Sequence, residues 1–313
     1  MIKPFTAALL HKHKKPLKIL KNLNFEEIKN KQVLVRIYYS GLCGSQVAEI
    51  NGFRDDSKYL PHLLGHEGYG KVIKVGSKVS KVKINDKVIL SWIKGKGYNS
   101  KGIKIKFKDK IINAGPVTTF SKYSIISENR CYLAPKNINP QLAVLFGCAI
   151  PTGLGMLINE LKPKCNKNFI LFGAGGIGIV TLIGLKLFKP KSVTVVDINT
   201  KKYQFIKKIN KNYNFIRYTN NLREILKTNN NEFFDYAIDC SGKVESINTA
   251  FKVIKDKGEL IFASHPKKNK KITIDPFDLI KGKKLIGSWG GSCRMDKDIN
   301  KFYLLHKKKK INL

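Results

Sequence analysis

Short apolar runs alternate with longer helical patterns in the second half of the chain. Runs rich in β-branched and aromatic residues lie at 169–172, 193–197, 214–217, 234–239, 259–263 and 284–288. Segments suited to helices lie between them, at 178–188, 200–211, 221–228 and 244–255. Strands that alternate with helices in this way predict a parallel, doubly wound sheet. The ligand site of such a sheet lies at the carboxyl ends of its strands.

The first part of the chain, up to about residue 140, has a different pattern that predicts a β-rich domain. β-Branched runs at 32–39, 70–75, 86–90 and 119–126 are short, and Gly, Ser, Asn and Asp separate them, as in small antiparallel sheets. Residues 94–115 are rich in Lys and Gly and predict a surface loop or a hairpin. Helices are expected at 141–146 and 153–161.

A glycine-rich turn follows the first apolar run of the α/β part. Gly173, Gly175, Gly176 and Gly178 separate this run from an apolar helix, and Asp197 ends the next run. This order is that of a dinucleotide-binding unit, in which the glycines let the backbone approach a pyrophosphate at the helix N-terminus. The carboxylate of Asp197 would bind both hydroxyls of an adenosine ribose and repel a phosphate there. The pattern therefore predicts NAD rather than NADP.

Charge is the most unusual feature of the composition. The chain has 59 Lys and Arg residues against 22 Asp and Glu residues, a formal net charge of +37. Arg, whose forked side chain suits phosphate and base recognition, occurs at only six positions, and the Lys residues are spread over the whole chain. Enrichment of Lys together with Asn and Ile favours coding bias over a specific nucleic-acid partner. A polyanion-binding protein remains the weaker alternative.

The cysteine pattern and the N-terminal residues indicate the cellular compartment of the protein. The six cysteines form no CxxC pair and no disulfide framework, so we expect reduced thiols. The N-terminal residues lack the apolar core of a signal peptide, and no apolar run is long enough to span a bilayer. The sequence therefore predicts a soluble, cytoplasmic protein of two domains, because 313 residues are long for a single core.

Two cysteines and one histidine, residue types that commonly bind metals, lie outside the β-branched runs in predicted loops. Cys43 follows a predicted strand, His66 stands beside Glu67 between glycines, and Cys148 comes just before the α/β part. Two sulfurs and one imidazole nitrogen with an open fourth position are typical of catalytic zinc. His62 lies close to this motif but receives no role. The other four thiols are expected to be structural: Cys131, Cys165, Cys240 and Cys293.

Five motifs together resemble the zinc-dependent medium-chain alcohol dehydrogenase family, in the family's order and over nearly the whole chain. They are Cys-Gly-Ser at 43–45, Gly-His-Glu at 65–67, Gly-Cys-Ala-Ile-Pro-Thr-Gly at 147–153, Gly-Ala-Gly-Gly-Ile-Gly at 173–178 and Gly-Ser-Trp-Gly-Gly at 287–291. The resemblance implies an α/β protein with a β-rich GroES-like catalytic domain at 1–148 and a doubly wound parallel Rossmann domain at 149–288. Residues 289–313 would be a shortened return segment to the catalytic domain.

The resemblance also implies the chemistry and the roles of the site residues. Cys43, His66 and Cys148 would hold one zinc ion per chain, and Glu67 would be a close neighbour able to exchange onto the metal. Ser45 would bind the substrate oxygen and start the path of the proton. NAD would be held by Thr152, by the glycine turn with Gly173, Gly175, Gly176 and Gly178, and by Asp197 with Lys202. The reaction would be hydride transfer between an alcohol or polyol, or its aldehyde or ketone, and the nicotinamide ring.

Three departures from the family pattern modify these expectations. The segment 94–115 lacks the four cysteines of a structural zinc site, so we expect no second zinc. The position usually held by Asp is Gln46, whose amide oxygen would accept the hydrogen bond of the ligand histidine, and a proton-relaying His is replaced by Ala48. Proton release by another route, such as water, is therefore a hypothesis.

The third departure is that the chain ends soon after a predicted helix at 296–308, before the segment that usually completes the family's catalytic domain. A catalytically impaired remnant of the same fold is therefore a second hypothesis. The resemblance also implies a homodimer or homotetramer that pairs through residues 284–289.

Overall fold

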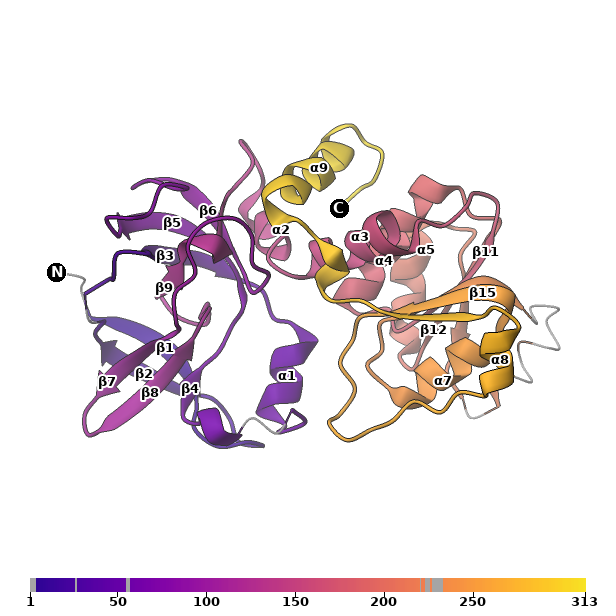
Figure 1. Cartoon of the computed structure of the whole chain (residues 1–313), viewed down its shortest axis with the longest axis horizontal. Helices are drawn as coiled ribbons and strands as arrows, with labels where there is room; N and C mark the ends of the chain where they lie inside the picture. Colours follow the sequence, from indigo (N-terminus) through magenta and orange to yellow (C-terminus); the bar gives the residue numbers. More distant parts are fainter. Residues whose placement is uncertain (1–3, 26, 55–56, 220, 223–225, 227–232) are drawn as a thin grey trace. The chain divides into compact units, whose positions relative to one another are not determined.

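The computed structural model describes residues 4–25, 27–54, 57–219, 221–222, 226 and 233–313. Two compact units make up the chain (Figure 1). The first comprises residues 1–149 and 294–303, and the second comprises residues 150–293 and 304–313. The helix expected at 221–228 falls largely outside the described residues.

Two five-stranded sheets form the first unit, with strand orders β2-β1-β4-β8-β7 and β10-β6-β5-β3-β9. The first contains β1 (Phe5–Leu10), β2 (Lys18–Leu23), β4 (His62–Leu63), β7 (Ile103–Phe107) and β8 (Lys110–Gly115). The second contains β3 (Gln32–Ser40), β5 (Glu67–Val75), β6 (Lys87–Ser91), β9 (Tyr123–Ser127) and β10 (Cys131–Leu133). Nearly all pairs are antiparallel, as the short β-branched runs predicted.

Each sheet of the first unit has its own apolar core. Val33 and Val35 of β3, two residues apart and so on one face, pack into the core of the second sheet. The segment 94–115 contains the hairpin β7–β8, one of the two predicted alternatives. Its Ile105 and Ile112 are buried in the core of the first sheet, so this hairpin is a structural part of the unit.

Helices of the first unit are few and short. They are α1 (Gly44–Ile50), α2 (Pro140–Leu145), the single turns η1 (Ser57–Tyr59) and η2 (Glu128–Arg130), and the first part of α9 (Met295–Lys307). Asn139 caps α2 by accepting hydrogen bonds from the amides of Gln141 and Leu142. The predicted helix at 141–146 is thereby confirmed.

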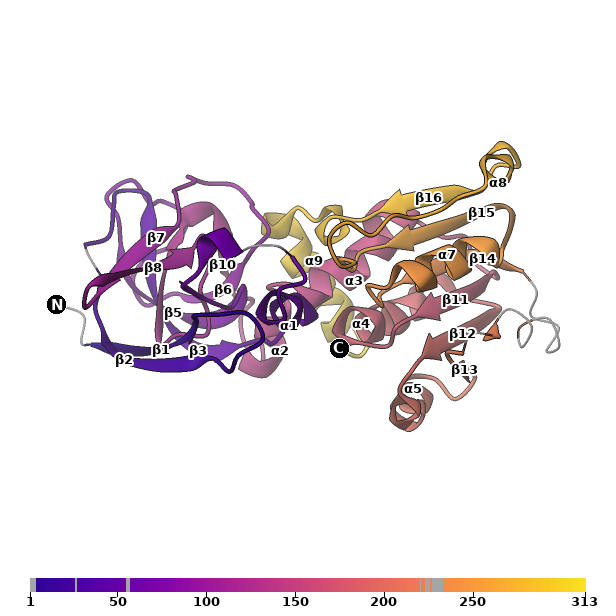
Figure 2. The ribbon, with the colours of Figure 1, turned by 90° about the horizontal axis from the view of Figure 1, so that it is seen from below.

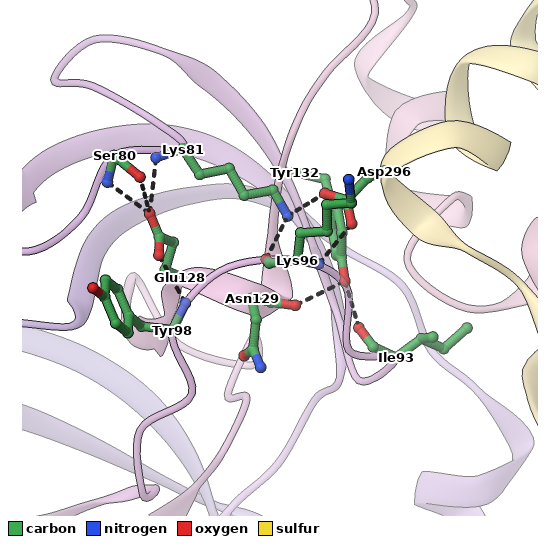
Figure 3. Close-up of polar contacts among 9 residues, drawn as sticks. All are labelled: Ser80, Lys81, Ile93, Lys96, Tyr98, Glu128, Asn129, Tyr132 and Asp296. Carbon is green, nitrogen blue, oxygen red and sulfur yellow. Dashed lines mark hydrogen bonds and ion pairs between the residues drawn. The ribbon is translucent and has the colours of Figure 1, made fainter.

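Two buried or partly buried carboxylates hold the loop between β6 and β7. Glu128 accepts hydrogen bonds from the backbone N–H groups of Ser80, Lys81 and Tyr98, at 2.6, 2.8 and 2.8 Å. Asp296, at the start of α9, accepts one from the backbone N–H of Lys96. Figure 3 shows both carboxylates together with Lys81. Side-chain oxygens thus pair loop amides that would otherwise be unsatisfied.

The second unit is one six-stranded parallel sheet, with the order β13-β12-β11-β14-β15-β16 (Figure 2). Its strands are β11 (Asn168–Phe172), β12 (Ser192–Asp197), β13 (Asn214–Arg217), β14 (Phe234–Asp239), β15 (Ile254–Phe262) and β16 (Lys284–Gly287). All six strands were expected from the apolar runs. The doubly wound parallel fold predicted from the sequence is confirmed.

Apolar cores cover both faces of this sheet. Phe169 and Leu171 of β11 point into one core, whereas Ile170 and Phe172 point into the other. The helical elements are α3 (Ala149–Gly155), the π-helical segment η3 (Met156–Leu161), α4 (Gly176–Leu185), η4 (Lys186–Phe188), η5 (Thr200–Lys202), α5 (Tyr203–Ile209), α7 (Val244–Lys252), α8 (Pro276–Ile280) and η6 (Gly290–Ser292). Burial on both faces explains the continuous apolar runs of the strands.

Two predicted helix boundaries were wrong. The helix expected at 244–255 ends at Lys252, because residues from Ile254 onward already pair with β14. The helix expected at 153–161 begins earlier, at Ala149, and its second half is π-helical. Among the described residues, no helix combines the length and apolar character needed to cross a bilayer.

Candidate functional site: a metal cluster and a dinucleotide cavity

Four potential metal ligands meet in the first unit: Cys43, His66, Glu67 and Cys148. Each offers a ligand atom, and these atoms all lie within 4.8 Å of one another. Cys43 directly precedes α1, and Cys148 directly precedes α3. Glu67 is the first residue of β5, and His66 comes directly before it. Three segments far apart in sequence therefore meet at one point.

The geometry of the cluster fits a tetrahedral metal. The sulfur atoms of Cys43 and Cys148 are 4.0 Å apart. Two thiolates at a Zn–S distance of about 2.3 Å in a tetrahedral site lie about 3.8 Å apart, so little movement is required. The Nε2 atom of His66 is buried without a nitrogen or oxygen partner among the described residues. An inward-facing imidazole nitrogen beside two sulfurs is what a zinc site requires.

Gln46 positions the ligand histidine. Its side chain is 2% exposed, and its amide nitrogen contacts Nδ1 of His66. The amide oxygen instead accepts a hydrogen bond from the backbone N–H of Cys43 at 3.2 Å. The expectation that this oxygen would accept from the histidine was therefore wrong, because the first amide of the Cys43 turn already occupies it.

The charge of the cluster favours a cation. A hydrogen bond from Cys148 lowers the pKa of Cys43 to about 3, so this thiol readily becomes a thiolate. The same contact raises the pKa of Cys148. Burial, together with the negative charge on Cys43, raises the pKa of Glu67 to about 8. Cys148 and Glu67 therefore resist ionisation beside the Cys43 thiolate, and a divalent cation would stabilise the negative charges of such a cluster.

Glycines make room for the cluster. Gly65 has a φ of +97°, and a side chain there would collide with Thr119 and the amide of Phe120. Only glycine adopts this conformation readily, and it turns the chain so that His66 and Glu67 follow at the site. The indole N–H of Trp92 donates to the sulfur of Cys148 at 3.3 Å. A hydrogen bond to a sulfur tunes a thiolate ligand.

The glycine turn of the second unit lies between β11 and α4, as predicted. Gly173 has a φ of +87° and donates its N–H to the carbonyl of Val196 at 2.8 Å. A side chain on Gly178 would lie 2.0 Å from the carbonyl oxygen of Gly173. This position therefore requires glycine for the close packing of α4 on the turn. The free N–H groups at the start of α4 suit an anion.

Asp197 is the centre of the polar contacts beside this turn. The residue is 6% exposed. Its carboxylate accepts hydrogen bonds from the amides of Ala174 and Asn199 at 2.7 and 2.8 Å and from the ammonium group of Lys202 at 2.8 Å. Burial alone would raise the pKa of Asp197, but the Lys202 contact and the two amides lower it below its usual value. Asp197 is therefore an ionised acceptor at neutral pH.

Two cavities lie beyond the carboxyl ends of the strands. The larger, of about 440 Å³, is lined by Gly173, Gly175, Asp197 and Lys202 together with residues that follow β13 and β14. The smaller, of about 280 Å³, is lined by residues 262–266 and 287–289, which follow β15 and β16. This is the edge at which doubly wound sheets bind dinucleotides.

Comparisons with known proteins agree with this geometry. Residues 29–136 match the alcohol dehydrogenase GroES-like domain, and residues 176–305 match the zinc-binding dehydrogenase domain. The chain belongs to the zinc-dependent medium-chain alcohol dehydrogenase family. It is an oxidoreductase of this family, and the family's cofactors are zinc and NAD(H).

Relatives of this dehydrogenase chain cover most of its length. It is 25% identical to the S-(hydroxymethyl)glutathione dehydrogenase of Synechocystis sp., over 92% of this chain and 85% of the relative. It is 26% identical to alcohol dehydrogenase 6 of Peromyscus maniculatus, over 98% and 88%. Among solved structures, benzyl alcohol dehydrogenase from Acinetobacter calcoaceticus aligns with a TM-score of 0.86 at 22% identity, over 99% of this chain and 91% of that one, which shows the shared fold.

The other predicted site residues lie in helices near the two sites. Ser45 lies in α1, and its hydroxyl oxygen is buried without a nitrogen or oxygen partner among the described residues. Thr152 is buried in α3 and does not line the larger cavity. Gly176 is the first residue of α4. The role of Thr152 in cofactor binding therefore stays a prediction.

Other residues of the two sites were not foreseen. Ile198, Tyr218, Lys243, Glu245 and Ser246 also line the larger cavity. Ile198 and Tyr218 each come directly after a strand's carboxyl end, and that position was the signal that could have found them. The contact between Trp92 and Cys148 gave no such signal, because the packing of residues 147–148 against the end of β6, where Ser91 donates to the carbonyl of Gly147, is not visible in the sequence.

Proposed function

We propose that this chain is an NAD-dependent zinc alcohol dehydrogenase that transfers a hydride between an alcohol or polyol, or the corresponding aldehyde or ketone, and the nicotinamide ring. The observation that carries the proposal is the cluster of two thiols, one imidazole and one carboxylate, whose ligand atoms lie within 4.8 Å of one another and of which Glu67 and Cys148 are buried. The names of the relatives, alcohol dehydrogenase and S-(hydroxymethyl)glutathione dehydrogenase, support this reaction class.

Cys43, His66 and Cys148 would hold the zinc ion, with Glu67 as a neighbouring carboxylate. When bound, zinc supplies a Lewis acid at the substrate oxygen, and NAD⁺ supplies the hydride acceptor. The buried hydroxyl of Ser45, two residues after Cys43, would accept the proton of the substrate hydroxyl. Gln46 keeps the imidazole of His66 in a fixed orientation.

The dinucleotide would bind across the glycine turn. The first amides of α4 would contact the pyrophosphate, with Gly173, Gly175, Gly176 and Gly178 keeping the backbone free of side chains. Asp197 would accept hydrogen bonds from the adenosine ribose, while Lys202 holds the carboxylate in place. Thr152 would contact the cofactor from α3. A ribose phosphate would meet the negative charge of Asp197, which favours NAD over NADP.

The proposal also covers the roles of the domains, the oligomeric state and the cellular compartment. Residues 1–148 would form the catalytic domain, 149–288 the NAD domain and 289–313 the return segment. The outer strand β16 has a free edge in the sheet order, and Trp289 just after it is 65% exposed. Both features support a homodimer or homotetramer that pairs through residues 284–289. The sequence has no CxxC pair and no disulfide framework, in keeping with a cytoplasmic protein.

A substrate screen tests the proposed function. The purified chain, loaded with zinc, is mixed with NAD⁺ and with ethanol, benzyl alcohol, butanediol or S-(hydroxymethyl)glutathione in turn, and NADH absorbance is followed. We expect NADH from at least one alcohol, slower reduction of NADP⁺, and no turnover by the Cys148→Ser variant. A folded, zinc-loaded wild type that reduces NAD⁺ with none of these alcohols would contradict the proposal.

A further inference from the structure

Trp92 connects the metal cluster to the loop that follows β6. Its indole N–H donates to the sulfur of Cys148 at 3.3 Å. A tryptophan side chain has only two rotatable bonds, so the place that its N–H can reach depends on where the backbone of Trp92 lies. The contacts of this backbone therefore control the hydrogen bond to the metal ligand.

Ser91 ties the segment of the donor to the segment of the acceptor. It is buried at the end of β6, and its hydroxyl donates to the carbonyl oxygen of Gly147 at 2.6 Å. The same hydroxyl oxygen accepts a hydrogen bond from the N–H of Ile93 at 3.0 Å. One side chain thus joins the residue before Cys148 to the residue after Trp92.

Turn η2 and strand β10 hold the backbone of the loop from the other side. The guanidinium of Arg130 donates to the carbonyl oxygen of Trp92. The hydroxyl of Tyr132 lies 2.7 Å from the carbonyl oxygen of Ile93 and 2.8 Å from that of Asn129, and the two share its hydrogen atom (Figure 3). The carbonyl groups of two successive loop residues are therefore fixed by buried side chains.

Arg130 is a buried cation. The residue is 9% exposed, and its Nε atom is buried without a hydrogen-bond partner among the described residues. Burial lowers the pKa of Arg130, and no carboxylate in the described part of the chain opposes this effect. An uncharged side chain would cost less free energy here. What the charge adds is a stronger hydrogen bond to the carbonyl of Trp92, because charge-assisted hydrogen bonds are roughly twice as strong as neutral ones.

We propose that Arg130 and Tyr132 are positioning residues of the metal site, which hold the backbone of Trp92 so that its indole N–H donates to Cys148. The inference rests on the proposed zinc site and adds two residues that act on it through Trp92. A hydrogen bond to a thiolate offsets part of its negative charge, and the loss of such a partner of a metal ligand typically changes metal affinity by about 10- to 100-fold. Arg130 and Tyr132 thereby couple the loop after β6 to the strength of metal binding.

Four variants and one control test this role. Trp92→Phe removes the indole donor, Arg130→Met removes the guanidinium, and Tyr132→Phe removes only a hydroxyl group. The double variant W92F/R130M tests whether Arg130 acts through Trp92. Arg36→Met makes the same change at an exposed arginine of β3 in the same unit and serves as the control. Thermal unfolding establishes that each variant is folded.

The indole N–H groups report the hydrogen bond directly. The chain has two tryptophans, Trp92 in the first unit and Trp289 in the second, so isotope-labelled tryptophan gives two indole N–H signals in an NMR spectrum, recorded with and without zinc. The Trp92 signal should move in Cys148→Ala, which removes the acceptor, and likewise in R130M and Y132F. The signal of Trp289, a residue that is 65% exposed, serves as the internal reference, and R36M should leave both signals unchanged.

Zinc affinity, measured by competition with a chelator, reports the effect on the metal site. It should fall about 10-fold in W92F and in R130M, and by a smaller factor in Y132F, which keeps the contact of Arg130. W92F/R130M should lose no more than W92F alone, because the effects of residues that act through one another do not add. R36M should bind zinc as wild type does.

Three outcomes would overturn the positioning role. A folded R130M or Y132F with both the indole signal and the zinc affinity of wild type would leave these residues a structural role only, and Y132F decides by this readout if R130M does not fold. A double variant whose loss equals the sum of the two single losses would show that Arg130 does not act through Trp92. A wild type that binds no zinc would remove the proposed metal site as well, whereas a zinc-binding wild type beside unaffected variants removes the positioning role alone.

Discussion

Asp296 accepts a hydrogen bond from the backbone N–H of Lys96 at 2.7 Å, although 200 residues separate the two in the sequence. The same carboxylate forms an ion pair with Lys81 at 2.5 Å (Figure 3). Residues near the end of the chain therefore complete the loop of the first unit that follows β6 and Trp92. This loop contains no cysteine, and carboxylates hold it in place.

Replacing Asp296 with Ala should destabilise the first unit selectively. The change removes a hydrogen bond and an ion pair from a charged group that is partly buried, which costs on the order of 1–3 kcal/mol. The chain has two tryptophans, Trp92 in the first unit and Trp289 in the second. In a W289F background, urea unfolding followed by Trp92 fluorescence should therefore show a lower midpoint. The D109A variant in the same background is the control, and equal midpoints for the two would contradict the prediction.

Asp239 should make the second unit less stable as the pH rises from about 4 to 7. Burial raises the pKa of Asp239 to about 7, despite hydrogen bonds from Ser241. In this window the unfolded chain releases the proton and the folded chain keeps it, so the free energy of unfolding falls by up to roughly 4 kcal/mol. Asp239→Asn should lack this loss. Urea unfolding of both at pH 5 and pH 8, followed by Trp289 fluorescence in a W92F background, tests the sign, and parallel pH dependences would contradict it.

Replacing Gln46 with Glu should tighten zinc binding. The single amide oxygen of Gln46 accepts from the N–H of Cys43, which leaves an amide nitrogen against the ring of His66. A Glu side chain has the same length and offers one oxygen to the N–H of Cys43 and one to the ring of His66. A carboxylate that accepts from a ligand histidine makes the imidazole more basic, which changes the affinity for zinc by about 10-fold or more. Competition with a chelator at constant pH measures the change. Weaker zinc binding by a folded Q46E would show that burying the extra charge dominates.

Asp197→Asn should weaken NAD binding and reduce discrimination against NADP. Hydrogen bonds to a charged group contribute about 1.5–3 kcal/mol, which corresponds to roughly a 10- to 100-fold loss in affinity for NADH. The repulsion of a ribose phosphate also disappears with the charge. Fluorescence titrations with NADH and NADPH give both affinities, and Asp256→Asn, an exposed site in the same unit, is the control. An unchanged ratio of the two affinities would exclude this role for Asp197.

Much of the second unit could be predicted from sequence, because its strands are buried on both faces. Continuous apolar runs such as 169–172 mark these strands, and Gly173 to Gly178 mark the turn that follows. Helix ends were harder to predict: residues 254–255 looked helical, yet pairing with β14 places them in a strand. Tertiary pairing of this kind overrides local propensity.

In the first unit, the residue types indicated the metal chemistry, but they did not predict which side chains contact one another. Cys43, His66 and Cys148 were recognisable from the motifs around them, and the structure brings them together. His62 gave no signal, because its partner Glu49 becomes a neighbour only through the packing of α1. The orientation of the Gln46 amide likewise depends on the backbone N–H of Cys43, which no sequence pattern reveals.

The zinc content of the purified chain, measured as metal atoms per polypeptide alongside the Cys43→Ser/Cys148→Ser double variant, tests the central claim most directly. The cluster of Cys43, His66 and Cys148 predicts about one zinc per wild-type chain and almost none in the folded double variant. A folded wild type without zinc, or a double variant that retains it, would show that these residues are not the metal site.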